Sequence, residues 1–210
     1  MVDGAEGGLR SLLSGIRSYA EELGLDLSRP EDRFKWFLAS MLYAKRISAE
    51  IARRTYRRFE EEGLTTPRAI LEAGWDRLVE VLDSGGYTRY DFSTASNLLE
   101  AMNKLIGEYG DLEGLHEASA DPRDLERRLM EFRGIGPVGV NIFLRELRGI
   151  WAKADPEPSR VALEVASRLG VKDVKHNESA LVRIGLECCR KRRCTLCKFN
   201  GYCSKLEIQR

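Results

Sequence analysis

Two glycines at the junction of two helical patterns constrain the fold of this chain more than any other feature. Gly134 and Gly136 stand between apolar helical repeats over residues 125–132 and 138–147, and Pro137 follows directly. Glycine reaches positive φ without a Cβ clash, so this step lets the chain reverse tightly. Proline suits the first turn of a helix, where its missing N–H costs nothing. The pattern predicts a helix–tight turn–helix hairpin.

The start of the second hairpin helix is a predicted anion site. The first N–H groups of a helix have no partner within the helix and carry the positive end of its dipole. A DNA phosphate bound there would be held through its backbone, without sequence being read. The candidate contacts are Gly134, Gly136, Val138 and Gly139. An ordinary helical hairpin with a glycine turn explains the same residues, so the hairpin alone leaves both interpretations open.

The other apolar residues also recur at helical spacing, and no segment alternates as a strand does. Ser48, Thr66-Pro67, Asp121-Pro122 and Ser159 indicate helix starts. The first helix should end at Gly24 and the last should open at Asn177. We therefore expect an all-α chain of roughly ten helices joined by short loops.

The 210 residues are enough for two small lobes. We expect residues 25–135 to form one lobe, and residues 1–24 together with 136–210 to form the other. A cleft between them would be lined by the hairpin and by Asp155.

Charge is nearly balanced over the whole chain but not at its end. The net charge is +1, whereas residues 188–210 hold one acid, Glu207, and seven cations. These cations are Arg190, Lys191, Arg192, Arg193, Lys198, Lys205 and Arg210. Such a cluster is typical of a phosphate-binding patch, and a solvated face is the alternative.

No apolar run is long enough to cross a membrane, and the N-terminus does not resemble a signal peptide. We expect a cytoplasmic monomer without a membrane partner, associated with the nucleoid, or nuclear in a eukaryote.

All five cysteines fall within residues 188–203. Cys194, Cys197 and Cys203 form a tight set, and Cys188 or Cys189 supplies a fourth thiol. Cysteines gathered in one tail of an intracellular chain favour a metal centre over a disulfide scaffold. Four thiolates suit either zinc or a [4Fe–4S] cluster, and spacing alone does not separate the two. Buried cysteines without a ligand are the third interpretation.

Asp155 follows an apolar helix and precedes Pro156 and Pro158, which fix its backbone. A carboxylate at the mouth of a cleft can stabilise positive charge developing on a sugar or orient an attacking water. The alternative is a turn acid or a helix cap.

Further candidates lie in the loops that would face the same cleft. Lys45 and Arg46 stand in a break between two apolar helices and are candidate DNA contacts. Tyr43, Tyr87 and Tyr90 are candidates for stacking on a base, with core or rim packing as the alternative. His116 and His176 are expected in polar loops, and no role follows for them.

Taken together, these motifs resemble the helix-hairpin-helix DNA glycosylase superfamily, in its endonuclease III-like branch. The resemblance is carried by Gly134-Ile135-Gly136-Pro137, by Asp155 with Arg160-Val161 after it, and by the C-terminal cysteines. Leu42-Tyr43-Ala44-Lys45 falls where that family has Leu-Ser-Ala-Gln, and Gly86-Tyr87 where it has a Gly-aromatic turn. The similarity runs from about residue 30 to residue 205.

The resemblance implies a two-lobed all-α enzyme with a C-terminal cysteine-ligated cluster loop. Such an enzyme binds damaged or mismatched double-stranded DNA through the hairpin and flips the base into the cleft. Asp155 takes the position of the family's catalytic aspartate, and Lys45 that of the residue that fills the gap left by the base. The implied cofactor is a [4Fe–4S] cluster, with zinc as the alternative.

This chain departs from the family at three places. Bifunctional members carry a Schiff-base lysine where this chain has Val138, so we expect a monofunctional enzyme in which Asp155 activates water. Lys45 replaces the gap-filling glutamine, which changes how the opposite base is read. The interval before Cys194 is shorter than in the family: five residues from Cys188 and four from Cys189. We take Cys188 as the first ligand because it is the smaller departure.

Two other functions remain open. One is a glycosylase with lyase activity through a displaced lysine, Lys153 or Lys45. The other is a non-catalytic module that binds damaged DNA. The sequence leaves the excised base undetermined.

Overall fold

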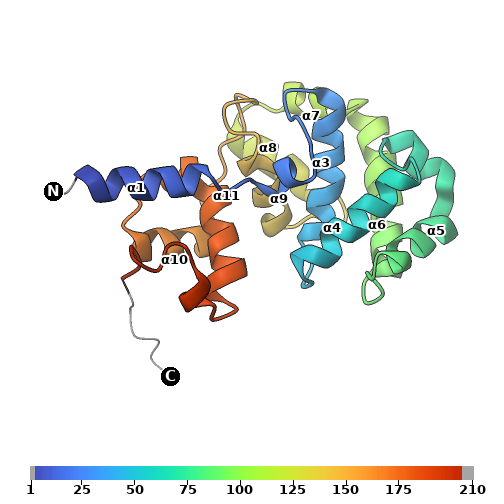
Figure 1. Ribbon diagram of the computed structural model, residues 1–210. Coiled ribbons are helices and arrows are strands. Elements are labelled where there is room, and N and C mark those ends of the chain that lie inside the picture. Colours follow the sequence, from blue (N-terminus) through green and yellow to red (C-terminus); the bar gives the residue numbers. More distant parts are fainter. Residues whose placement is uncertain (1–2, 205–210) are drawn as a thin grey trace. The chain divides into compact units, whose positions relative to one another are not determined.

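The computed structural model describes residues 3–204, which are helices, turns and loops without a strand. The all-α prediction is therefore confirmed for this part of the chain. The chain folds into two compact units: Met1–Glu22 with Glu157–Arg210, and Leu23–Pro156. Figure 1 shows the larger unit from blue α3 to yellow α9, and the smaller unit as α1 with orange and red α10 and α11.

The larger unit is a helical bundle. Its elements are, in order, α3 (Pro30–Tyr43), α4 (Ala49–Glu61), α5 (Pro67–Ser84), α6 (Asp91–Lys104), the π-helical turn η1 (Leu105–Tyr109), α7 (Leu112–Ala118), α8 (Pro122–Met130) and α9 (Pro137–Arg145).

Side-chain caps begin many of these helices where the sequence predicted them. Ser48 accepts a hydrogen bond from the Ile51 amide, and Thr66 one from the Ala69 amide. Asp121 caps α8 through the Asp124 amide. These bonds satisfy N–H groups that a helix leaves unpaired.

Aromatic rings form the centre of the larger unit. Phe37 of α3 is fully buried and meets Phe132 and Phe143 edge-on, with ring centroids 5.8 and 5.2 Å apart. Trp36 Nε1 donates a hydrogen bond to the Phe143 carbonyl at 3.2 Å. Because Phe143 lies on α9, these contacts fix the second helix of the hairpin against α3.

The smaller unit is built from α1 (Asp3–Ser14), α2 (Tyr19–Glu22), α10 (Arg160–Leu169), α11 (Val174–Ile184), the π-helical turn η2 (Gly185–Cys189) and the short 3₁₀ helix η3 (Cys194–Leu196). Its core joins Leu13 of α1 to Val165 of α10 and Leu181 of α11, and Phe199 of the tail packs into the same cluster.

The structure differs from the sequence expectations at identifiable points. Residues 136–156 belong to the larger unit rather than to the smaller one, because α9 packs on α3. The first helix ends at Ser14 and α2 is separate, whereas the sequence suggested one helix to Gly24. The last helix begins after an Asp173 cap, before the expected Asn177.

No helix within residues 3–204 is long and apolar enough to cross a membrane.

Candidate nucleic-acid interface and metal centre

The hairpin turn depends on the missing side chain of Gly134. Its φ is +85°, a region that L side chains rarely adopt. A Cβ at this position would also lie 2.6 Å from Asn97 Nδ2 and 2.9 Å from Asn97 Cβ. Gly134 therefore both turns the chain and lets the hairpin lie directly on α6.

The second hairpin helix begins with an open amide end. Gly136 is the N-cap of α9 and no side chain caps it, while a Cβ at Gly136 would meet no atom within 4 Å. Val138, in the first turn, is 63% exposed. The space beside these amides is therefore open, as an anion site requires. Gly139 has a different role because its Cα faces the core, where a Cβ would lie 3.5 Å from that of Ala44.

This packing brings the α3–α4 loop to the start of α9. Ala44 immediately precedes Lys45, which is half-buried, and Arg46, which is exposed. Neither cation forms an ion pair with a carboxylate among residues 3–204. The structure thus brings together two predicted DNA contacts, the hairpin and the Lys45 loop, from segments far apart in the sequence.

The three predicted base-pocket tyrosines have different surroundings. Tyr87 is 1% exposed, and its hydroxyl donates to the Leu42 carbonyl at 2.9 Å, which supports the end of α3. Burial raises the pKa of this hydroxyl above its usual range. Tyr43 is half-buried, with its ring 6.1 Å from that of Trp36. Tyr90 is half-buried, and the Arg89 guanidinium lies 5.5 Å from its ring. Tyr87 therefore packs the core, whereas Tyr43 and Tyr90 are partly exposed, with the hydroxyl of Tyr43 itself buried.

Asp155 stands at the end of the larger unit with its carboxylate accessible and paired. Its side chain is 51% exposed, and Oδ1 lies 3.7 Å from Nε of Arg148, whose side chain is 15% exposed. Arg148 Nη2 donates to the Pro156 carbonyl at 2.6 Å. One nearly buried guanidinium therefore holds both the carboxylate and the peptide that follows it.

Helix α7 anchors the segment that leads to Asp155. The His116 ring stacks on Trp151, with centroids 4.6 Å apart and planes 9° apart. Trp151 Nε1 donates to Glu113 at 3.2 Å, and Lys153 Nζ donates to the His116 carbonyl at 2.7 Å. Burial lowers the pKa of His116.

Sequence reasoning placed His116 in a polar loop and gave it no role. The α-helical spacing of Leu112 and Leu115 was the signal that would have found α7.

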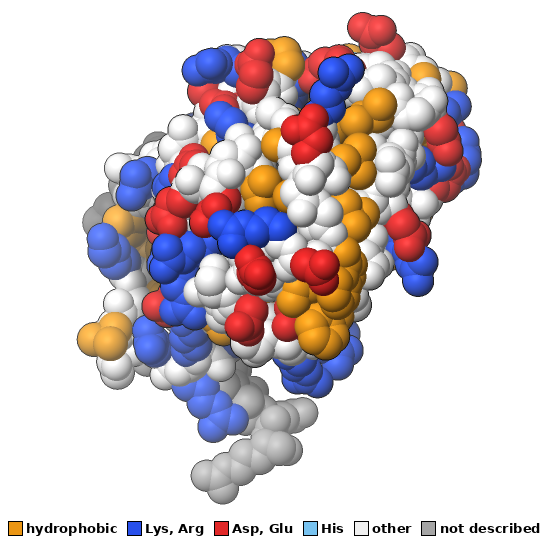
Figure 2. Space-filling view, turned by 90° about the vertical axis from the view of Figure 1, so that its right-hand side faces the viewer, with side chains coloured by type: hydrophobic (Ala, Val, Ile, Leu, Met, Phe, Trp, Pro, Cys, Tyr) orange, Lys and Arg blue, Asp and Glu red, His pale blue; other side chains and the backbone are white. Residues whose placement is uncertain are grey.

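The basic tail lies in the smaller unit. Arg190, Lys191, Arg192, Arg193 and Lys198 are all exposed, and none pairs with a carboxylate within the described chain. Figure 2 shows, for contrast, a face on which cations and acids are interspersed beside a band of hydrophobic side chains. Lys205, Glu207 and Arg210 lie outside the described residues.

The cysteines of the tail influence one another electrostatically. Burial raises the pKa of Cys188 to about 11, and the nearby Cys197 adds to the increase. Burial also raises the pKa of Cys189; Arg168 opposes this rise, while Cys197, Cys203 and Cys194 add to it. Mutual repulsion of this kind is what a cation placed among thiolates removes, so the donor chemistry suits a metal. Within residues 3–204, however, no three His, Cys, Asp or Glu side chains form a group that could hold a metal ion.

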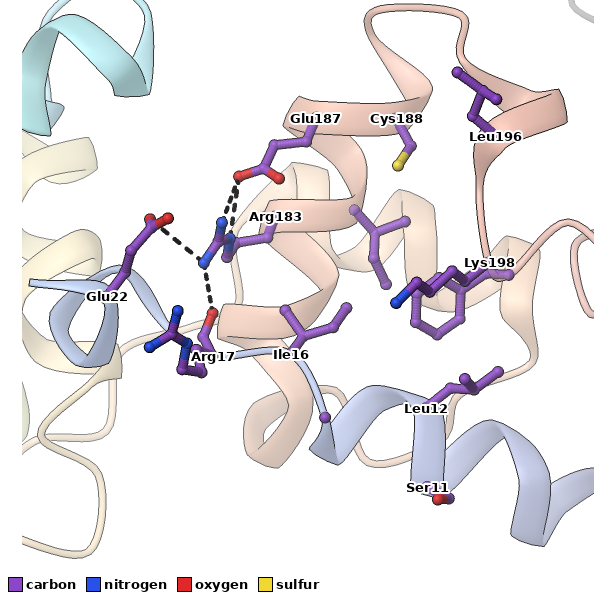
Figure 3. A pocket seen from close by; sticks show the side chains of 13 residues that line it. Ser11, Leu12, Ile16, Arg17, Glu22, Arg183, Glu187, Cys188, Leu196 and Lys198 are labelled. Atoms are coloured by element: carbon purple, nitrogen blue, oxygen red, sulfur yellow. Dashed lines mark hydrogen bonds and ion pairs between the residues drawn. The ribbon is translucent and has the colours of Figure 1, made fainter.

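A cavity of about 470 Å³ lies beside this tail in the smaller unit, with α1 and α11 on its sides. Figure 3 shows Arg183 on one side of it, bonded to Glu187 at 2.9 Å, to Glu22 at 3.5 Å and to the Arg17 carbonyl at 2.8 Å. Cys188 and Lys198 also line this cavity.

No protein-family model matches the chain, and no curated protein matches it either.

Proposed function

We propose that this protein is a monofunctional DNA glycosylase that removes a damaged or mismatched base from duplex DNA. The observation that carries the proposal is the position of the Lys45 loop against the uncapped start of α9, where Gly139 meets Ala44. Open amides and two unpaired cations at one place suit a nucleic-acid backbone. Phosphate contacts of this kind hold a duplex without reading its sequence.

Asp155 supplies the chemistry in this proposal. The flipped nucleotide would place its C1′ near the carboxylate, which accepts a proton from water as the water oxygen attacks C1′. The N-glycosidic bond breaks and its electron pair leaves with the base. The base takes up the proton that water gave to the carboxylate, so the carboxylate is regenerated. The negative carboxylate stabilises the positive charge that develops on the sugar. Arg148 keeps this carboxylate in place through its contacts with Asp155 and Pro156.

The valine at position 138 and the hydrogen bonds of Lys153 favour water over a covalent intermediate. Val138 occupies the place where bifunctional relatives carry the nucleophilic lysine. Lys153, a candidate replacement, gives two of its N–H groups to the carbonyls of His116 and Glu117, at 2.7 and 3.3 Å. An amine held in this way does not present a free electron pair to a sugar carbon.

The cysteine tail would hold a metal centre, a [4Fe–4S] cluster or zinc. Its ligands would be Cys194, Cys197, Cys203 and one of the adjacent pair Cys188 and Cys189. Bound there, the group would fix the loop that carries Arg190–Arg193, which otherwise consists of turns without regular helix. Its role in the proposal is structural: the rigid loop would hold cations for phosphate contact.

Base release from duplexes that each carry one lesion tests the activity. The panel holds alkylated, deaminated and oxidised bases and mismatched thymine, and free base is measured by chromatography. We expect release from at least one duplex and its loss in Asp155→Asn, which keeps size but removes the charge. Glu157→Gln, a nearby exposed acid on the other side of Pro156, is the matched control and should keep activity.

Failure of every duplex, or full activity in Asp155→Asn, contradicts the proposal. Borohydride reduction on abasic DNA tests the lyase alternative, because only a Schiff base is trapped as a covalent adduct. Salt-sensitive DNA binding that survives Asp155→Asn, without any release of base, would instead indicate a non-catalytic binding module.

A further inference from the structure

An exposed aromatic pair lies where α5 packs on α6. Trp75 of α5 is 39% exposed and Phe92 of α6 is 61% exposed, with their ring centroids 5.4 Å apart. The other two tryptophans, Trp36 and Trp151, are 0% and 4% exposed. A single exposed apolar side chain is ordinary, whereas a contiguous exposed patch marks an interaction site.

The backbone of α5 presents Trp75 at this place. Gly74 has a φ of +72°, which interrupts the helix, and Trp75 opens its second segment. The indole Nε1 donates to the Ser96 hydroxyl of α6 at 3.0 Å, so the ring lies across the junction of the two helices. Its orientation is fixed before any partner binds, which lowers the entropic cost of binding.

Apolar residues extend this pair along both helices. Val79 follows Trp75 by one turn on α5, and Leu99 follows Phe92 by two turns on α6; both are partly exposed. Residues with these spacings share one side of a helix. We call Trp75, Val79, Phe92 and Leu99 the α5–α6 face. Figure 2 looks onto the side of the molecule where Figure 1 places α5, and it shows a continuous band of hydrophobic side chains there.

Carboxylates border the α5–α6 face on its α5 side. Asp76 and Asp83 are exposed, lie seven positions apart on one stripe of α5, and form no ion pair in the part of the chain that the structure describes. Seven helical residues are two turns, or about 10.5 Å. Arg77, the cation beside Asp76, is already paired with Glu62 and Glu80. The border is therefore negative.

The negative border decides among the occupants that an aromatic pair can take. Bases stack on exposed aromatic rings, but single-stranded nucleic acid also needs cations for its phosphates. A second copy of the chain docked through the same face would bring two negative borders to one interface. A basic segment of another protein meets neither obstacle. Cations two turns apart on a helix would match the spacing of Asp76 and Asp83.

We propose that the α5–α6 face is the docking site of a basic amphipathic helix of a partner protein. The apolar side of that helix packs on Trp75 and Phe92, and its Lys or Arg residues pair with Asp76 and Asp83. The face belongs to the larger unit, and the inference depends neither on base excision nor on the metal centre.

Quenching of Trp75 fluorescence tests the charge of the border, because the other tryptophans are buried. Caesium and iodide ions both quench exposed indole rings and carry opposite charges. The border should concentrate caesium and repel iodide. The ratio of the caesium to the iodide quenching constant should therefore fall about 2-fold at low salt in Asp76→Asn with Asp83→Asn, and change little at high salt. An unchanged ratio at low salt contradicts the negative border.

A synthetic peptide of about 14 residues is the probe for docking, with leucines on one helical side and lysines two turns apart beside them. Its fluorescein-labelled form is titrated with the full-length protein and followed by anisotropy. Trp75 emission is followed with the unlabelled peptide. We expect saturable binding and a blue shift of this emission, because docking removes the indole from water. A peptide of scrambled order and one with glutamates for the lysines should not bind.

Substitutions separate the apolar from the electrostatic contribution. Phe92→Ser should weaken binding at least about 10-fold, since aromatic anchors carry most of the energy of such interfaces. Asp76→Asn with Asp83→Asn should weaken it about 5-fold at low salt and less at high salt. Glu50→Gln with Glu117→Gln removes two exposed acids on other helices, which pair with no cation among the described residues, and should leave binding unchanged.

Several outcomes would overturn the proposal. They are failure of the wild-type protein to bind the peptide, undiminished binding by Phe92→Ser, and equal weakening in the two pairs of acid variants. A single-stranded oligonucleotide that shifts Trp75 emission where the peptide does not would identify a stacking surface for bases instead. Self-association of the free protein that Trp75→Ala abolishes, measured by sedimentation, would identify a second copy as the occupant. The wild-type titrations do not depend on the folding of any variant.

Discussion

At the scale of single residues, the pair of Arg148 and Asp155 joins a buried cation to an accessible anion. Arg148 is 15% exposed and Asp155 is 51% exposed, with Nε and Oδ1 3.7 Å apart. A guanidinium is charged at any physiological pH and offers several donors in one plane. Arg148 donates one of them, from Nη2, to the Pro156 carbonyl, and its contact with Asp155 is an ion pair. Its role in the proposed reaction is therefore to position the carboxylate, without touching the substrate.

Arg148→Met should slow base release more than it weakens DNA binding. Methionine keeps the apolar stem and removes both contacts, so the carboxylate loses its fixed orientation. Misplacement of a reacting group by about 1 Å costs on the order of 10- to 100-fold in rate. Single-turnover rates at saturating enzyme should show this loss, while the dissociation constant for duplex DNA stays within about 2-fold because the proposed phosphate contacts lie elsewhere.

Arg148→Lys is the matched control for charge. Lysine keeps the cation but loses the planar fork, so its rate should fall between those of wild type and Arg148→Met. Equal loss of binding and rate in Arg148→Met would indicate general disruption and contradict the positioning role.

The sequence predicted Asp155 but not its partner. Asp155 can be recognised from the local sequence, because the two prolines that follow it restrict its backbone. Arg148 is one of many arginines in this chain, and its contact with Asp155 forms only when the segment between them turns back. Gly134 shows the intermediate case: the sequence indicated the turn, whereas the contact with Asn97 of α6 depends on how the helices pack.

At the scale of secondary-structure elements, α7 packs against the segment that leads to Asp155 and holds it by hydrogen bonds. The His116 ring lies flat on Trp151, and Lys153 donates to carbonyls at the end of α7. Trp151 also donates to Glu113, which pairs with Arg33 of α3 at 2.7 Å. The loop is therefore attached to the bundle through α7.

The attachment by His116 should make stability depend on pH. Burial lowers the pKa of His116 in the folded protein, whereas the unfolded chain keeps a value of about 6.5. Below that value the unfolded state binds more protons than the folded state. The free energy of unfolding therefore decreases as the pH is lowered. The contribution of His116 is complete above about pH 6.5 and is lost as the pH falls toward the lowered folded pKa.

Replacement of His116 by Phe should reduce this dependence while keeping a ring on Trp151. The measurement is the melting temperature at pH 8 and at pH 5.5, and the difference between them should be smaller in His116→Phe than in wild type. His176→Gln is the control, because the only other histidine is exposed and should leave the difference unchanged. An unchanged difference in His116→Phe would contradict the coupling.

Helix starts were the elements that the sequence predicted best. Ser48, Thr66, Asp121 and Ser159 each accept the amide hydrogen bond expected of them. A cap is a local interaction over three residues, so a local pattern determines it. The division into units was predicted less well, because the assignment of residues 136–156 depends on contacts between Phe143 and α3, which lie about a hundred positions apart in the chain.

At the scale of the whole molecule, the two units divide the predicted DNA contacts. The larger unit holds the hairpin, the Lys45 loop and Asp155, and the smaller unit holds the basic tail. A net charge of +1 does not by itself attract DNA, so attraction has to come from local groups of cations. Arg190–Arg193 form such a group, exposed and without ion pairs to carboxylates in residues 3–204.

The salt dependence of DNA binding should identify the part played by this group. Each phosphate contact makes the negative slope of log K against log salt concentration steeper by about 0.9, because counterions are released. If Arg192 and Arg193 both contact phosphate, the double variant Arg192→Gln with Arg193→Gln should reduce the magnitude of this slope by about 1.8. The same double change should weaken binding most at low salt, where unscreened charges act over the longest range.

A second pair of substitutions controls for net charge. Arg68 and Lys172 are exposed, lie on other segments and pair with no carboxylate in the described chain, so Arg68→Gln with Lys172→Gln removes the same charge. Affinity is measured by fluorescence anisotropy on one duplex at several salt concentrations, after metal content has been shown to equal that of wild type. A general charge effect would lower both slopes equally, whereas direct phosphate contact by the tail lowers only the first. Equal slopes in the two double variants would therefore exclude the tail from the DNA interface and leave binding to the hairpin and the Lys45 loop.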